Sequence, residues 1–293
     1  EIKNINNKRK WTEKLIHRPC PLCGQSNYVI ISRKMKDGIN LPTVICKNCT
    51  LVYTNPIPVE EIYNRFYLEA YNDFYIHQDK FIPSSKVVPG DVNEILKIIQ
   101  SHLTDNKSRI LEIGLGSGRL LYYLSEKYAN VQGIEPGSNA KYAREILNLN
   151  IIEDFFESHE FGDEKFDLIV MVHVLEHFYN LKRTILKCHE LLSNDGYLLI
   201  ELPNILKPYR SLDHYFLRYV HPVNFSPFTI KSFLSINGFS IVFEDSKGVK
   251  GFGPKNIRVM AVKQSGTGFS PSTGDSDYKD IIRQLRIKRF EWI

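Results

Sequence analysis

The stretch RILEIGLGSGRLL, residues 109–121, decides the fold, because it has the pattern of a buried strand, a tight glycine turn and a helix. Gly114, Gly116 and Gly118 occupy the turn. Glycine lets a ligand approach the backbone closely, and the helix that follows presents unpaired N–H groups at its first turn. The segment therefore predicts a nucleotide-like ligand in front of these glycines.

The spacing of the glycines and the residue before them distinguish between two possible ligands, NAD and S-adenosylmethionine. The dinucleotide fingerprint G-x-G-x-x-G would need its third glycine where Arg119 stands. Glu112 places a carboxylate just before the turn, which repels a pyrophosphate and suits a ligand with a positive charge. We therefore expect S-adenosylmethionine rather than NAD. Glu135 ends the next strand, where an acidic side chain accepts the ribose hydroxyls of either ligand or caps the following helix.

Strands and helices alternate on both sides of this turn. Alternation at this spacing indicates a parallel sheet wound on both faces, and the uniformly apolar strands fit burial on both sides. The last two strands follow one another directly and predict an antiparallel hairpin. The expected strands are 109–114, 131–136, 151–154, 166–174, 197–204, 240–246 and 257–264, and the expected helices are 91–103, 118–128, 138–148, 181–192 and 231–239.

Four of the five cysteines form two C-x-x-C pairs, Cys20 with Cys23 and Cys46 with Cys49. Two such pairs about twenty residues apart have the spacing of a structural, four-thiolate zinc site. Two disulfides are the alternative, but they require an oxidising compartment that nothing else in the chain indicates. We expect a zinc ribbon over residues 1–58, with Cys188 as a small buried hydrophobe.

Two further segments flank the alternating region of residues 91–263. Residues 59–90 are expected to form an aromatic helical connector or lid, since Tyr63, Phe66, Tyr67, Tyr71, Phe74 and Tyr75 recur at helical spacing. Such a stripe usually packs in a core, but Tyr71 and Tyr75 are also candidates to shield a cation. Residues 264–293 are expected to be a linker and a basic amphipathic helix, which packs on a partner or on the body of the protein or stays solvated.

Bulk composition narrows the class of protein. The 293 residues are 43% hydrophobic and carry a net charge of +5, which is too weak to indicate nucleic acid. No apolar run approaches the roughly 20 residues that span a bilayer, and the N-terminus lacks a signal-peptide core. We expect a cytoplasmic protein.

Five motifs follow one another in the chain: ILEIGLGSGRLL, VQGIEP, FDLIVMVHVLEHF, LLSNDGYLLIELPN and HPVNFSPFTIKSFLSINGF. In this order and spacing they resemble the class I S-adenosylmethionine-dependent methyltransferases over residues 91–263. With the N-terminal cysteine module, the chain is similar to bacterial methyltransferases that carry a zinc-binding domain before the catalytic one, some of which act on nucleotide-linked sugars. The resemblance implies an α/β, doubly wound, seven-stranded and mostly parallel sheet whose last strand is antiparallel.

The resemblance also implies roles for residues at the strand ends. Glu112 and the glycines would hold the amino-acid part of S-adenosylmethionine, and Glu135 would bind its ribose. Asp154 and Phe155 follow the third strand, where they are placed to meet the adenine. His173 would lie beside the cofactor, or would simply be a histidine satisfied at a strand end, and a tyrosine segment that includes Tyr71 would cover the cofactor.

Methyl transfer from a sulfonium is an in-line displacement, so the protein must orient the acceptor and remove a proton. His177 and His221 are the candidate bases, because both fall in segments expected to flank the crevice. Each also has a structural interpretation, in which His177 buttresses a helix and His221 holds a turn. Lys207, Arg210 and Arg218 are candidates for binding a phosphate or carboxylate, or are solvated surface charges.

One departure from the family narrows the reaction. In sugar C-methyltransferases with this arrangement, a glutamate and a nearby tyrosine precede the second histidine, whereas here Val220 precedes His221 and Arg218 precedes Tyr219. We therefore expect O- or N-methylation of a sugar, a nucleotide-linked sugar or a glycan precursor. The alternatives are RNA methylation, against which the weakly basic ribbon argues, and a non-catalytic scaffold that recruits a partner protein through the ribbon or the C-terminal helix.

Overall fold

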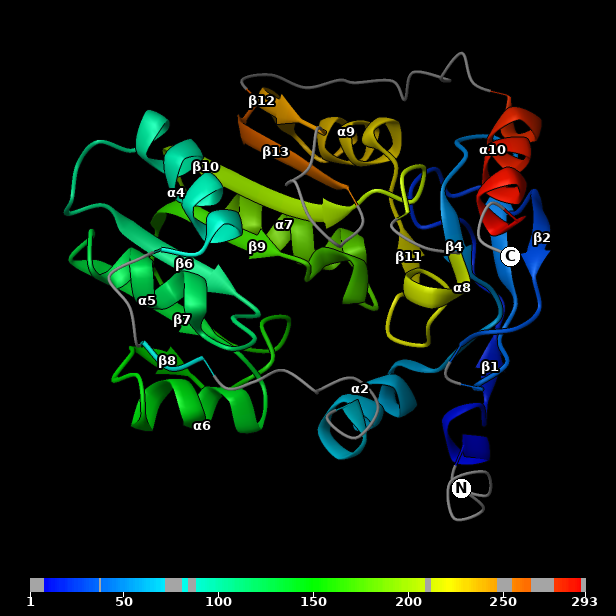
Figure 1. The fold of residues 1–293 in the computed structure, drawn as a ribbon, viewed down its shortest axis with the longest axis horizontal. Helices are drawn as coiled ribbons and strands as arrows, with labels where there is room; N and C mark the ends of the chain where they lie inside the picture. Colours follow the sequence, from blue (N-terminus) through cyan, green and yellow to red (C-terminus); the bar gives the residue numbers. More distant parts are fainter. Residues whose placement is uncertain are drawn as a thin grey trace.

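The computed structural model describes residues 8–36, 38–71, 81–83, 88–208, 212–246, 255–264 and 277–290. A seven-stranded sheet forms its larger part (Figure 1), with the strand order β12-β13-β10-β9-β6-β7-β8. Only β13 runs antiparallel to its neighbours in this sheet, so the mostly parallel sheet and its closing hairpin are confirmed. The strands are β6 (Arg109–Ile113), β7 (Asn130–Ile134), β8 (Ile151–Ile152), β9 (Phe166–Val172), β10 (Leu192–Pro203), β12 (Phe239–Asp245) and β13 (Asn256–Lys263).

Strand β9 shows why the sheet is covered on both faces. Successive side chains of a strand point to opposite faces, and residues 168–171 of β9 are apolar and buried on both faces. Leu168 and Val170 join the core beneath helices α4, α5 and α6, while Ile169 and Met171 join the core beneath α7 and α9. These helices are α4 (Gly90–His102), α5 (Arg119–Ser125), α6 (Ser138–Glu145), α7 (Leu181–Leu191) and α9 (Pro227–Ile236).

Local sequence explains where several helices begin. Helix α4 buries residues at helical spacing, Val92, Ile95, Leu96 and Ile99. Helix α9 starts with a capping box, in which Ser226 and Thr229 satisfy each other's backbone N–H groups, and Pro227 stands at the first helical position. Because β6, β7, β8, β9 and β10 run parallel, their carboxyl ends lie on one side of the sheet.

A four-stranded sheet with the order β11-β4-β3-β2 lies beside that side (Figure 1). Strands β2 (Tyr28–Ser32), β3 (Thr43–Cys46) and β4 (Val52–Thr54) come from the N-terminal region, whereas β11 (Val223–Asn224) follows His221. Val223 pairs with Tyr53, and Val44 and Phe225 belong to the same apolar core as the α7 face of the large sheet. A domain boundary at residue 58 remains a prediction from the sequence.

The remaining elements pack around this junction. Helix α2 (Glu60–Glu69) buries Tyr63 and Phe66 in an aromatic cluster with Trp11 and Tyr219. Helix α10 (Tyr278–Phe290) places Ile281 and Leu285 in a core with β3, β4 and helix α8, so its apolar face contacts its own chain (Figure 1). The short elements are η2 (Arg9–Trp11), β1 (Leu15–Ile16), β5 (Ile57–Pro58), η3 (Leu175–His177) and α8 (Leu212–Tyr215).

Candidate functional site

The glycine turn that follows β6 adopts backbone angles that favour glycine. Gly114, Gly116 and Gly118 have φ values of 69°, 53° and 77°. A Cβ atom on Gly114 would also lie 2.6 Å from Cγ2 of Val174. The turn thus brings the backbone of β6 against the segment after β9 and starts α5 with its N–H groups facing the crevice.

Two carboxylates stand beside this turn, the buried Glu112 and the half-buried Glu135. Glu112 is 2% exposed, and its Oε2 atom has no hydrogen-bond partner among the described residues. Burial, followed by the negative charge of Glu135, raises the pKa of Glu112 well above its usual value. Burial likewise raises the pKa of Glu135 to about 8, against hydrogen bonds from the backbone of Leu115 and Gly116 and from Asn139. A cationic ligand would stabilise the charged form of both groups.

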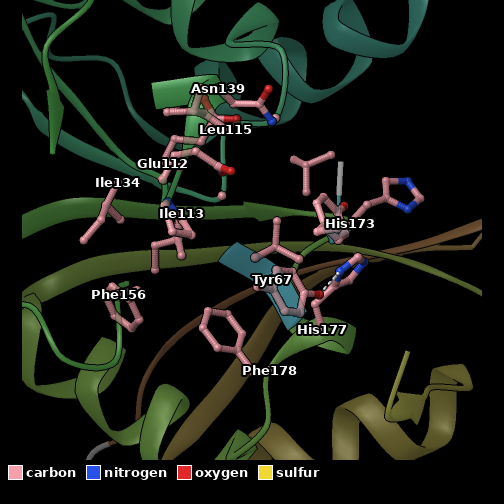
Figure 2. A pocket seen from close by; sticks show the side chains of 18 of the residues that line it. Tyr67, Glu112, Ile113, Leu115, Ile134, Asn139, Phe156, His173, His177 and Phe178 are labelled. Atoms are coloured by element: carbon pink, nitrogen blue, oxygen red, sulfur yellow. Dashed lines mark hydrogen bonds between the residues drawn. The ribbon is translucent and has the colours of Figure 1, made fainter. Parts of the chain in front are cut away.

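One cavity of about 730 Å³ extends from the glycine turn to a group of tyrosines and histidines (Figure 2). Its lining includes Glu112, Gly114, Gly116, Glu135 and Phe155. Asp154 is not among the described lining residues, and its carboxylate instead accepts hydrogen bonds from the backbone of Phe155 and from His159. Gly118 also lies outside the lining, at the start of α5, where its Cβ would meet Leu147.

The three candidate histidines lie at the opposite end of the cavity. His173 and His177 line it, whereas His221 is buried behind His177, with 4.8 Å between the ring centroids. Burial, with the nearby charges of His173 and Arg218, lowers the pKa of His177 to about 3, and burial lowers that of His221 well below its usual value. Both side chains are therefore neutral at physiological pH.

The tyrosines of α2 cover these histidines. The Tyr67 hydroxyl lies 2.6 Å from Nδ1 of His177, as Figure 2 shows, and its ring stacks on Tyr71 at a centroid distance of 4.8 Å. The Tyr63 hydroxyl donates hydrogen bonds to the carbonyls of His177 and Val220, which joins the two histidine segments. Tyr71 lines the cavity, while Phe74 and Tyr75 lie outside the described residues.

Our interpretation of the sequence missed a charged group beneath His173. Glu201 and Arg258 are register partners on β10 and β13, and the Arg258 guanidinium donates to the Glu201 carboxylate. His173 Nε2 lies 3.2 Å from Oε1 of the same carboxylate. Glu176, also missed, is 1% exposed, and both of its carboxylate oxygens lack a hydrogen-bond partner among the described residues. The sequence does contain a signal for the Glu201–Arg258 pair. Glu201 stands among the apolar residues of β10, and Arg258, of opposite charge, stands among those of β13.

Two of the basic candidates in the segment after β10, Lys207 and Arg218, are not among the described lining residues of the cavity. Lys207 is exposed, and Arg218 lies over the Tyr215 ring at 5.4 Å from its centroid. Arg210 lies outside the described residues. A role for these residues in binding an anionic acceptor remains a prediction.

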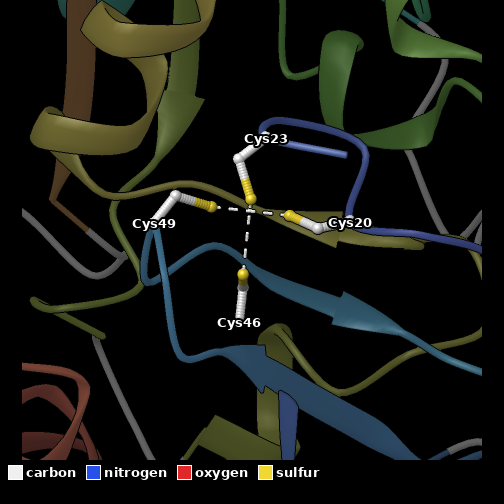
Figure 3. A group of neighbouring side chains, drawn as sticks. All are labelled: Cys20, Cys23, Cys46 and Cys49. Carbon is white, nitrogen blue, oxygen red and sulfur yellow. Dashed lines mark hydrogen bonds between the residues drawn. The ribbon is translucent and has the colours of Figure 1, made fainter. Parts of the chain in front are cut away.

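The four N-terminal cysteines converge on one point (Figure 3). The Sγ atoms of Cys20 and Cys49 lie 3.4 Å apart, those of Cys23 and Cys46 lie 3.5 Å apart, and all four are within 4.8 Å of one another. A tetrahedral zinc site with Zn–S bonds of about 2.3 Å has S···S edges of about 3.8 Å. The donor set and its geometry are consistent with zinc.

Comparison with known families adds an independent finding. A family model described as a methyltransferase domain matches residues 90–243, which is more than half of the 293-residue chain. The ubiquinone biosynthesis O-methyltransferase of Glaesserella parasuis serovar 5 (strain SH0165) is 36% identical to the chain over 107 residues. This match covers 33% of the chain and 45% of that protein, so the chain spans less than half of this curated relative.

Solved structures that are similar to the chain include two methyltransferases. The S-adenosylmethionine-dependent methyltransferase from Mesorhizobium loti is 15% identical with a TM-score of 0.47, over 57% of this chain and 96% of that one. The CcbJ methyltransferase from Streptomyces caelestis is 12% identical with a TM-score of 0.49, over 67% of this chain and 96% of that one. Within the described part of the chain, no helix combines the length and apolar character needed to cross a membrane.

Proposed function

The chain belongs to the methyltransferase-domain family and is an S-adenosylmethionine-dependent methyltransferase, and from this premise we propose that it methylates an oxygen or nitrogen of a small, carbohydrate-linked acceptor. The observation that carries the proposal is the single cavity that connects the glycine turn with an end lined by Tyr67, Tyr71, His173 and His177. Cofactor and acceptor would meet within this cavity.

The residues beside the turn fit S-adenosylmethionine. Glu112 brings an unpartnered, buried carboxylate oxygen to the crevice, and a Cβ on Gly114 would meet Val174. We assign the amino-acid part of the cofactor to Glu112, Gly114, Gly116 and Gly118, and its ribose to Glu135. Phe155 would contact the adenine, with Asp154 holding the Phe155 backbone, and Tyr71 would shield the sulfonium.

When bound, S-adenosylmethionine supplies an activated methyl group, so the protein has to orient the acceptor and accept its proton. Hydroxyl, amide and carboxylate groups line the acceptor end, which suits an acceptor rich in hydroxyl groups. Asn64, Tyr179, Tyr215 and Asn256 contribute to that lining. The O-methyltransferase in the name of the matched relative supports transfer to oxygen. Histidine is the proposed proton acceptor, since His173 and His177 lie on the cavity wall and His221 lies behind His177.

Calorimetric titration of the chain with S-adenosylhomocysteine and, separately, with NAD tests the cofactor assignment. We expect micromolar binding of S-adenosylhomocysteine and no binding of NAD. Release of S-adenosylhomocysteine from S-adenosylmethionine is then measured with a panel of sugar nucleotides, free sugars and amino sugars, and the methylated product is identified by mass spectrometry. If the protein methylated RNA but no member of this panel, the proposed acceptor class would be contradicted.

We also propose that Cys20, Cys23, Cys46 and Cys49 bind a structural zinc ion. Four thiolate ligands fill a tetrahedral site and leave no open position for water or substrate. Three of the four cysteines are buried in the core that the N-terminal sheet shares with the large sheet. The ion would therefore stabilise the junction on which the acceptor end of the cavity depends.

A further inference from the structure

His173 occupies the tip of the central strand β9 in an unusual backbone conformation. Its φ is 54°, a region that side-chain-bearing residues enter at some cost in free energy. The backbone N–H of His173 donates to the carbonyl of Glu201, 2.9 Å away, which fixes this conformation. The imidazole lines the cavity.

The side chain of His173 is fixed by the same residue. Its Nε2 lies 3.2 Å from Oε1 of Glu201, so Nε2–H donates to the carboxylate. Asn256 donates to the same oxygen over 2.7 Å, and Arg258 donates to the other oxygen. The Glu201 and Arg258 side chains are 5% and 4% exposed. A carboxylate held in this way selects the imidazole tautomer in which Nδ1 carries a lone pair.

The Nδ1 atom faces the groups of two other elements. The Tyr215 hydroxyl of α8 lies 3.3 Å from it, and Oε1 of Glu176, in η3, lies 3.8 Å from it. Tyr215 also lines the cavity. Although burial opposes the charged form, the carboxylates of Glu201 and Glu176 raise the pKa of His173, with Arg258 acting in the opposite direction.

The other two histidines are less suited to accept a proton. His221 is not among the described lining residues. The Tyr67 hydroxyl lies 2.6 Å from Nδ1 of His177, which is a shorter contact than the 3.3 Å between the Tyr215 hydroxyl and Nδ1 of His173. No carboxylate lies within hydrogen-bonding distance of either ring in the described part of the chain, since Oε1 of Glu176 is 4.0 Å from Nε2 of His177. An imidazolium formed at either position would lack the compensation that Glu201 gives to His173.

We propose that His173 is the general base of the methyl transfer, that Glu201 is its positioning residue, and that Arg258 keeps Glu201 charged. This inference rests on the proposed function and deepens it, because it selects one of three histidines. As the new bond between the acceptor atom and the methyl carbon forms and the bond from that carbon to sulfur breaks, the acceptor proton passes to Nδ1. The positive charge of the sulfonium is then carried by an imidazolium paired with Glu201, and the proton is later released to solvent.

The test compares His173→Asn, Glu201→Gln and His177→Asn with wild type and with the control Glu244→Gln, in which only the ion pair of Glu244 with Lys231 is lost. Calorimetric binding of S-adenosylhomocysteine reports the integrity of the cofactor site. Single-turnover methyl transfer is measured across pH with an acceptor from the panel described above. We expect His173→Asn to slow transfer by at least about 100-fold with S-adenosylhomocysteine affinity within about threefold of wild type.

Glu201→Gln is expected to lower the apparent pKa of the rate profile, because the imidazolium loses its paired carboxylate. His177→Asn should keep the wild-type pKa in its profile. The proposal is overturned if His173→Asn retains half of the wild-type rate, or if the Glu201→Gln profile superimposes on wild type. Arg258 would keep its ion pairs with Glu94 and Asp245 in Glu201→Gln. If this variant still does not fold, the double variant Glu201→Gln/Arg258→Met removes both buried charges.

A second readout needs no acceptor. In protein labelled with [¹³C]histidine and saturated with S-adenosylhomocysteine, the imidazole resonance that His173→Asn removes is expected to titrate above the usual range of histidine and to shift downward in Glu201→Gln. An unchanged pKa in Glu201→Gln would overturn the pairing of these residues. Failure to find any methylated acceptor, with this titration as expected, would instead count against the proposed acceptor class.

Discussion

Glu112 shows how one side chain can select a cofactor by charge. Its carboxylate is buried beside the glycine turn without a partner for Oε2 in the described part of the chain. A charge-assisted hydrogen bond contributes about 1.5–3 kcal/mol, so we expect Glu112→Gln to weaken binding of S-adenosylmethionine by about 10- to 100-fold. Calorimetry measures this change, with the exposed Glu126→Gln as control. Affinity within twofold of wild type would show that the crevice is wrongly assigned.

Glu135 is expected to make the stability of the ligand-free protein depend on pH. Its pKa rises from 4.5 to about 8 on burial, so the folded chain holds a proton that the unfolded chain releases at neutral pH. The stability of the ligand-free protein should therefore fall as the pH rises from about 4.5 to about 8. Glu135→Gln should be more stable than wild type by about 1–2 kcal/mol at pH 8, with a smaller gain at pH 5. Urea unfolding at the two pH values measures this, and an equal effect at both would contradict it.

At the scale of residues, the sequence predicts the cofactor side of the cavity better than the acceptor side. Glu112, Gly114 and Glu135 lie at strand ends within one motif each, so their meeting follows from the parallel sheet. Glu201 and Arg258 meet only because β13 pairs antiparallel with β10 in one particular register, which no local pattern specifies. Asp154 lies after the third strand in sequence, but its carboxylate accepts a hydrogen bond from the backbone N–H of Phe155, and Asp154 is not among the described lining residues of the cavity.

The turn between β6 and α5 is an element whose geometry excludes side chains. In Gly114→Ala, the methyl group would meet Val174 at 2.6 Å and the residue would keep a φ of 69°. We expect a loss of at least about 1–3 kcal/mol in the free energy of unfolding, measured by urea denaturation. The double variant Gly114→Ala/Val174→Ala should regain the part of the free energy of unfolding that is lost to the steric contact with Val174. The part that is lost to the positive φ should remain.

Gly90 supplies the matched control for this prediction. It stands at the first position of α4, and a Cβ there would have no neighbour within 4 Å. Gly90→Ala should leave stability unchanged or raise it by about 0.4–1 kcal/mol, because the unfolded chain loses conformational freedom. If Gly114→Ala proved as harmless as Gly90→Ala, the positive φ of the turn would not be a constraint on the element.

At the scale of elements, the large sheet and its helices were predictable because each has a strong local period. Strand β11 was not, since it has two residues, Val223 and Asn224, and pairs with β4 from the other end of the sequence. The packing of α10 could be stated from sequence only as alternatives, because an amphipathic helix does not specify what covers its apolar face. The structure places Ile281 and Leu285 of α10 against β3, β4 and α8.

At the scale of the whole molecule, the N-terminal sheet and the large sheet share one buried core beside the cysteine cluster. Cys46 and Val44 of the N-terminal sheet belong to the same buried core as Ile169 and Ile185 of the large sheet and α7. Strand β11, which pairs with β4, lies two residues after His221, and the Tyr63 hydroxyl binds the carbonyl before that histidine. Loss of the metal should therefore disturb the acceptor end of the cavity as well as the N-terminal sheet.

Cys46→Ser tests this coupling against Cys188→Ala, which alters a buried cysteine of α7 outside the cluster. We expect one zinc per chain in wild type and Cys188→Ala, and none in Cys46→Ser, by elemental analysis. Because the core is continuous, wild type should unfold in urea in a single transition. Loss of zinc should move this whole transition to lower urea concentration and reduce the free energy of unfolding by several kcal/mol. A separate early transition, with the main one left at its wild-type midpoint, would mean that the N-terminal sheet folds independently of the catalytic sheet and that zinc stabilises only the former.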